Sequence, residues 1–175
     1  MAAVTETKDP ENLISFSISA CEAQLQRAFQ VCDLLEALAD DLPRRQAPVW
    51  RETQRQCQSV LRPHFMLLIN VVLPILLKRS KENVDREEVL MRLVADNESQ
   101  LHALEDLDDL LSEAIAPGRS DNAESLGFAL RGFFDTLRHN LTWEVDVVWP
   151  LAKRVFTEVD AKDLNSSPYA QFIRH

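Results

Sequence analysis

Residues 14–42 read ISFSISACEAQLQRAFQVCDLLEALADDL, and their apolar side chains recur every three or four positions. This period of 3.6 residues indicates an amphipathic helix with one face directed inward. The expected inward side chains are Ile14, Ile18, Cys21, Leu25, Ala28, Cys32, Leu35 and Ala39. The helix is expected to end before Pro43, because the residue that precedes a proline disfavours helical backbone.

Three further segments show the same period, and short stretches with turn residues separate them. They cover residues 49–80, 85–116 and about 120–159. The expected inward face of residues 49–80 consists of Trp50, Cys57, Val60, Leu61, His64, Leu68, Val71 and Ile75. Four segments of about 30 residues with short connections predict an all-α fold, an up-down-up-down four-helix bundle. The chain is expected to divide into a flexible N-terminal arm (1–13), the bundle (14–160) and a short C-terminal tail (161–175).

The composition excludes several classes of function. Only 3 of the 175 residues are glycine, which argues against a glycine-rich phosphate loop, and the net charge of −9 argues against nucleic-acid binding. No apolar run of 18 residues and no leader segment is evident, so neither a membrane partner nor secretion is expected. The three cysteines, Cys21, Cys32 and Cys57, lack disulfide or zinc spacing, which indicates a cytoplasmic protein.

An internal repeat connects the second and fourth segments. Residues 64–74, HFMLLINVVLP, align without gaps to residues 140–150, NLTWEVDVVWP. Each copy places a proline inside a helical segment, and Pro63 adds a third. Proline removes a backbone hydrogen bond and its ring clashes with the preceding turn, so kinks are expected at these positions.

The repeat resembles the hemerythrin-like, or HHE cation-binding, family. In that family the second and fourth helices each carry His-x-x-x-Glu/Asp, followed by an apolar pair and a proline. The stretch TWEVDVVWPLAKRVFT at residues 142–157 is similar to the fourth helix of bacterial members, and the resemblance extends from about residue 14 to residue 164. It implies a hemerythrin-like bundle whose relatives hold two irons between the four helices.

The ligand positions that the resemblance implies are mostly occupied by residues that do not bind metal. These vestigial positions are His64, Leu68, Asn97, Leu101, Asn140 and Glu144. Only His64 and Glu144 keep a metal-ligating side chain, and two protein ligands do not hold a bridged di-iron centre. No cofactor is therefore expected, and the alternative is a residual iron site formed by His64 and Glu144.

The polar residues on the inward faces require partners, because an unpaired buried polar group is costly. We expect Glu144 to form a hydrogen-bonded cluster with His64, Asn97 and Asn140. A helical wheel places His102 and His139 on the solvent side of their helices, away from this cluster.

The second and fourth segments carry more apolar surface than one core stripe requires. The expected interface residues are Phe65, Met66, Ile69, Phe134, Leu141, Val145 and Trp149. A homodimer would bury this surface, since twofold pairing is the commonest oligomer. In the alternative, the two termini of the chain cover it.

The sequence shows no Ser-His-Asp, Cys-His or paired-carboxylate arrangement, so no enzyme activity is expected. The predicted function is a non-catalytic regulatory or protein-interaction module that has lost its di-iron site. The alternative is a metal-binding hemerythrin-like protein that handles or senses iron, oxygen or nitric oxide.

Overall fold

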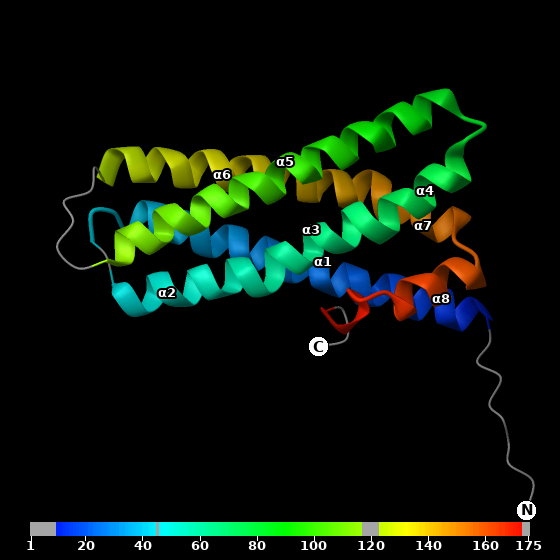
Figure 1. The fold of residues 1–175 in the computed structure, drawn as a ribbon, viewed down its shortest axis with the longest axis horizontal. Helices are drawn as coiled ribbons and strands as arrows, with labels where there is room; N and C mark the ends of the chain where they lie inside the picture. The colour runs from blue at the N-terminus through cyan, green and yellow to red at the C-terminus, as the bar shows by residue number, and fades with distance from the viewer. Residues whose placement is uncertain (1–9, 45, 117–122, 173–175) are drawn as a thin grey trace, which may run out of the picture.

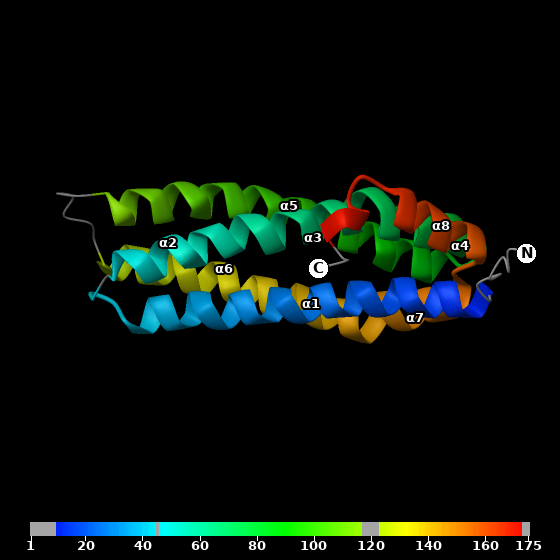
Figure 2. The same cartoon turned by 90° about the horizontal axis from the view of Figure 1, so that it is seen from below.

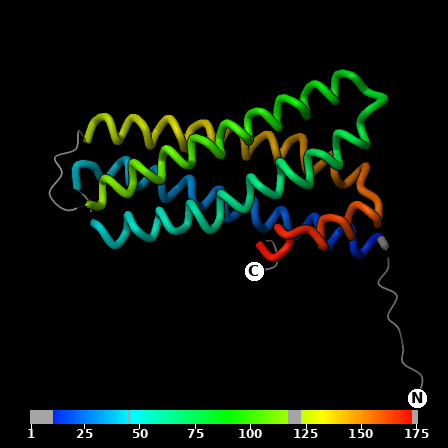
Figure 3. Tube along the Cα trace, in the orientation of Figure 1, coloured from blue at the N-terminus to red at the C-terminus, as the bar shows by residue number. Residues whose placement is uncertain are grey.

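The computed structural model describes residues 10–44, 46–116 and 123–172, and this part of the chain is helical without any strand. The predicted all-α class is therefore confirmed. Long helical segments cover residues 10–40, 47–80, 84–115 and 123–155, which we call the first to fourth passes, and a shorter segment returns at the C-terminal end (Figure 3). The elements are α1 (Pro10–Asp40), α2 (Ala47–Gln56), η1 (Cys57–Leu61), α3 (Arg62–Leu67), η2 (Leu68–Val72), α4 (Leu73–Ser80), α5 (Val84–Ile115), α6 (Ala123–Trp143), η3 (Glu144–Val148), α7 (Trp149–Val155), α8 (Glu158–Ser166) and η4 (Ala170–Phe172).

The ends of two helices do not coincide with the expected domain boundaries. Helix α1 begins at Pro10, so residues 10–13 belong to the first helix and not to an N-terminal arm. Helix α8 crosses the expected end of the bundle at residue 160. Residues 1–9 of the predicted arm, residues 173–175 of the predicted tail, and the turn expected at 117–122 lie outside the described residues.

The four long passes lie side by side (Figures 1 and 2). Helix α1 contacts α6, helix α6 contacts α5, and α5 in turn contacts α2, α3 and α4. The inward side chains predicted for the first helix are buried, except that Ile14 is half-buried. On α5 the buried stripe consists of Leu90, Leu93, Asn97, Gln100, Leu104, Leu107 and Leu111.

The three internal prolines produce π-helical turns. Each of the turns η1, η2 and η3 begins six residues before a proline, namely Pro63, Pro74 and Pro150. In each case the residue just before the proline donates its backbone N–H to the carbonyl five positions earlier, as Leu73 does to Leu68. The wider turn accommodates a proline ring that clashes with the carbonyl four residues earlier in an α-helix. The internal repeat is thus also a repeat of backbone geometry, with Leu68 and Glu144 at equivalent positions.

The π-turns change which side chains face inward. A π-turn contains one residue more than an α-turn, so the wheel of 3.6 residues loses register across it. In α4 the buried apolar side chains are Leu73 and Leu76, and Ser80 is buried as well. Val71 in η2 and Ile75 in α4, both on the predicted inward face, are only half-buried. Carbonyls near these turns also find side-chain donors, since the Gln24 amide donates to the Val60 carbonyl at 2.9 Å.

The C-terminal elements cover part of the second pass. Helix α8 contacts α1 and η2, and η4 contacts α3. Thr157 and Asp160 begin α8 with a reciprocal capping box. The Arg79 guanidinium of α4 donates to both Asp160 oxygens, at 3.1 and 3.0 Å, and to the Thr157 hydroxyl at 3.0 Å. This bidentate contact fixes the returning helix to the second pass.

The continuous helical segment Ala47–Ser80 is long and apolar enough, by length and composition, to cross a membrane. The expectation that the chain contains no apolar segment long enough to span a membrane is therefore wrong. Half of its most apolar window is buried inside the protein, and a core helix meets the same criterion. The finding is weak evidence for a membrane span.

Candidate functional site

His64 and Glu144 meet in the interior, as expected for polar residues on the inward faces of their helices. The Nε2 atom of His64 lies 2.9 Å from Oε1 of Glu144, and each side chain is only 1% exposed. His64 follows Pro63 in α3, and Glu144 is the first residue of η3. The contact therefore joins two passes at points that the proline-induced turns define.

The pair leaves hydrogen-bonding capacity unused. His64 Nδ1 and Glu144 Oε2 have no hydrogen-bond partner, and the same is true of Asn97 Oδ1 and Asn140 Nδ2. All of these atoms are buried, where an unmet donor or acceptor is unfavourable. The atoms include both a donor and acceptors, so a water molecule with several polar partners suits this chemistry.

The expected cluster of four residues does not form as predicted. Asn97 is buried, but its amide donates to the carbonyl of Leu93 in its own helix at 2.8 Å. The Nδ2 atom of Asn140 is without a partner, so it does not donate to Glu144. Asn side chains readily bond the carbonyl four residues earlier, which competes with contacts between helices. Only the His64–Glu144 bond joins two of the four residues.

The donor set does not fit a di-iron centre. Leu68 is fully buried and Leu101 is half-buried, and neither offers a ligand atom. Within residues 10–44, 46–116 and 123–172, no three His, Cys, Asp or Glu side chains lie close enough to hold a metal ion. His64 and Glu144 form a hydrogen bond with each other, and this bond occupies one potential metal-ligand atom on each side chain.

The three cysteines are buried thiols with raised pKa values. Burial raises the pKa of Cys21 to about 12, and the nearby Glu144 carboxylate adds to this rise. Burial also raises the pKa values of Cys32 and Cys57 to about 12. A thiol with such a pKa is protonated at neutral pH and is a poor nucleophile. These residues are core, and their position gives no support to redox sensing.

The wheel placed the remaining internal histidines correctly. His102 and His139 are exposed, and neither lies at the His64–Glu144 pair. His139 accepts a hydrogen bond from the Trp143 indole at 3.0 Å, which occupies one of its ring nitrogens at the surface.

Most of the predicted interface residues are buried within this chain. Phe65, Phe134, Leu141 and Trp149 are each no more than 4% exposed within this chain. Phe65 and Trp149 follow π-turns, which rotate them inward, whereas Phe134 and Leu141 belong to α6, which packs along α1. Of the remaining three predicted interface residues, Val145 is exposed, while Met66 and Ile69 are half-buried. The C-terminal elements cover part of the second pass, in line with the alternative of chain ends as cover.

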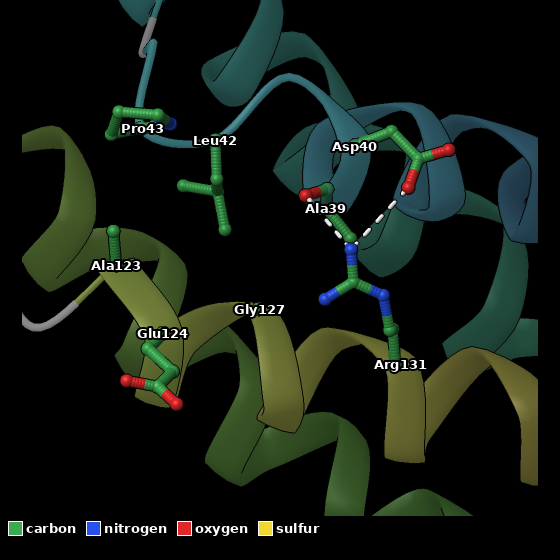
Figure 4. A pocket seen from close by; sticks show the side chains of 8 residues that line it. All are labelled: Ala39, Asp40, Leu42, Pro43, Ala123, Glu124, Gly127 and Arg131. Carbon is green, nitrogen blue, oxygen red and sulfur yellow. Dashed lines mark hydrogen bonds and ion pairs between the residues drawn. The ribbon is translucent and has the colours of Figure 1, made fainter.

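Clefts of a few hundred Å³ occur at the surface, away from the buried pair. One of about 380 Å³ lies between the end of α1 and the start of α6 (Figure 4). Its cation, Arg131, lies 3.4 Å from both the Ala39 carbonyl and the Asp40 carboxylate. Neither His64 nor Glu144 lines this cleft.

Several buried polar residues were not predicted from the sequence, and Gln100 is one of them. It lies on the buried stripe of α5, and its Oε1 atom has no partner. The signal was present, because Asn97 and Gln100 interrupt a run of leucines with the spacing of three and four that marks one helix face.

No protein-family model, no curated protein and no solved structure matches this chain. The resemblance to hemerythrin-like proteins therefore depends on the residues quoted above.

Proposed function

We propose that this chain is a hemerythrin-like, up-down-up-down four-helix bundle that works as a non-catalytic regulatory or protein-interaction module without a di-iron centre. The observation that supports this proposal most directly is the bond between His64 and Glu144. In this arrangement the two remaining ligand-type side chains satisfy each other, and apolar or amide residues occupy the other ligand positions. In this proposal the buried residues only stabilise the fold, and the surface of the protein binds its partner.

A residual iron site is the second candidate, and a specific observation favours it. His64 Nδ1 and Glu144 Oε2 are both buried and without partners. Imidazole nitrogen and carboxylate oxygen are suitable ligands for iron. A single ion held by this pair would correspond to a protein that handles or senses iron, oxygen or nitric oxide.

Thermal unfolding in the presence of Fe²⁺ under anaerobic conditions separates the two candidates. A ligand at about 100 times its dissociation constant stabilises a protein by about 2.7 kcal/mol, which raises the Tm by several degrees. The non-metal proposal predicts no change in Tm. A rise in Tm that Glu144→Gln abolishes would instead support the residual iron site.

The homodimer expected from the sequence stays a prediction. Its surface would have to be built from residues that are still exposed, such as Val145. Sedimentation velocity at micromolar concentration measures it directly, and a monomer would contradict it.

A further inference from the structure

The groove between α5 and α6 has a floor of small side chains. Ala103 of α5 and Ala129 and Gly132 of α6 line it, and its volume is about 350 Å³. A Cβ atom at Gly132 would meet no neighbouring side chain or helix within 4 Å. The backbone of α6 is therefore open to the close approach of another chain.

Exposed apolar side chains flank this floor. Leu110 of α5 lines the groove and is 38% exposed, and Phe128, one helical turn before Gly132, is 81% exposed. Trp143 at the other end of α6 is also exposed. Phe128 and Trp143 are about 22 Å apart along the helix axis at 1.5 Å per residue, which is the length of about four helical turns.

A buried acceptor gives the groove a polar contact point. Gln100 lines the groove, is only 4% exposed, and its Oε1 atom has no hydrogen-bond partner. This oxygen is itself buried, so a donor on an incoming chain would satisfy it once the Gln100 side chain turns toward the groove. This observation is independent of the small floor and also indicates a ligand.

The charge around the groove selects the kind of partner. Asp106 is the one charged residue among those that line it, and Asp135 is exposed one turn after Gly132. The whole chain carries a net charge of −9. Two copies that paired through this groove would bring acidic surfaces together, whereas a cationic partner would be attracted.

We propose that the α5–α6 groove binds an amphipathic helix of about 15 residues from another protein. Its apolar face lies over Gly132 between Leu110 and Phe128, and its lysine or arginine side chains face Asp106 and Asp135. This is the helix-in-groove mode, in which apolar anchors recur every three or four residues. The inference rests on the proposed function as an interaction module, and it names the surface and the class of partner.

Fluorescence anisotropy of a labelled peptide tests the groove with the full chain. The probe is a helical peptide of leucine and lysine, about four turns long, with leucine on one face. We expect it to bind, and we expect Gly132→Leu to weaken binding at least tenfold by filling the groove. Asp106→Lys should weaken binding at least fivefold. Ser19→Leu, an exposed position on α1, is the matched control and should leave binding unchanged.

Folding does not confound this test, because leucine has a higher helix propensity than glycine and the added side chain meets open space. The Tm of Gly132→Leu should equal or exceed that of the parent chain.

Three outcomes would overturn the proposal. They are no binding of the peptide at 100 µM, binding that neither Gly132→Leu nor Asp106→Lys changes, and a homodimer that Gly132→Leu dissociates. The last would assign the groove to a second copy of the chain. None of these outcomes changes the result of the Fe²⁺ measurement, so a failure of the groove is distinguishable from a failure of the proposed function.

Discussion

Glu144→Leu is expected to lower the free energy of unfolding by about 3 kcal/mol, although it replaces a charged residue in the core with an apolar one. The substitution leaves Nε2 of His64 buried without its partner at 2.9 Å. The nitrogen then loses its hydrogen bond and regains no contact with water. Leucine should fit at position 144, because Leu68 occupies the equivalent position in the second pass and is fully buried.

A double-mutant cycle isolates the bond from the effects of size. His64→Leu should cost about 4 kcal/mol, because it strands a buried carboxylate. The double variant His64→Leu/Glu144→Leu should lose about 2 kcal/mol less than the sum of the two single losses, since neither polar group is then left alone. Urea unfolding followed by circular dichroism measures all four free energies.

Asp146→Leu is the matched control for this cycle. Asp146 lies in the same π-turn as Glu144 but is exposed, so its replacement should change stability by no more than about 0.5 kcal/mol. Additive losses in the cycle would show that His64 and Glu144 do not stabilise each other.

Asp160→Ala is expected to produce the second large loss, about 3 kcal/mol. The carboxylate is buried, caps the first turn of α8 and accepts two hydrogen bonds from Arg79. Its removal breaks the capping box and the bidentate contact together. In hydrogen-exchange measurements on the Asp160→Ala variant, the backbone amides of α8 should therefore exchange faster than in the parent chain, whereas exchange in α5 should change less.

The pH dependence of this loss has a defined sign. Burial by itself would raise the pKa of Asp160, but hydrogen bonds from Arg79 and Thr157 outweigh it, and the pKa lies below the usual 3.8. A lowered carboxyl pKa contributes stability that is fully present above the unfolded pKa and is lost as the pH falls through the folded pKa. The difference in stability between the parent chain and Asp160→Ala should thus be constant from pH 5 to pH 7 and shrink below pH 3.8.

Asp163→Ala is the control for the second prediction, because Asp163 lies on the same helix, carries the same charge and is exposed. It should leave both stability and exchange in α8 unchanged. An equal loss for the two variants would show that the charge of α8, rather than its contact with Arg79, fixes the helix.

Periodicity predicted the helices well and their faces only in part. The first helix contains no internal proline, and its predicted inward side chains from Ile18 to Ala39 are buried. In the second pass, the turns η1 and η2 shift the register, so a wheel with a constant period misplaced Val71 and Ile75. The prolines that cause these turns were visible in the sequence, but proline alone does not distinguish a kink from a π-turn.

The candidate site was predictable to the extent that it depends on local spacing. The repeat placed His64 and Glu144 at related positions of two helices. Their contact follows because both side chains lie on the inward faces of these helices. The cluster with Asn97 and Asn140 was not predictable, because an asparagine can bond its own helix, as Asn97 does with Leu93. The burial of Phe134 and Leu141 was not predictable, because it depends on how closely α6 packs on α1. The residue pattern of a single helix does not contain this information.

A bonded His64–Glu144 pair stands where the resemblance implies a metal centre. Mass spectrometry of metal content tests it directly, on the full chain purified without chelators after expression in iron-rich medium. If the pair has replaced the metal, iron should be found at background level, well below one atom per chain. One or two irons per chain, lost on Glu144→Gln, would contradict it and restore the metal-binding function.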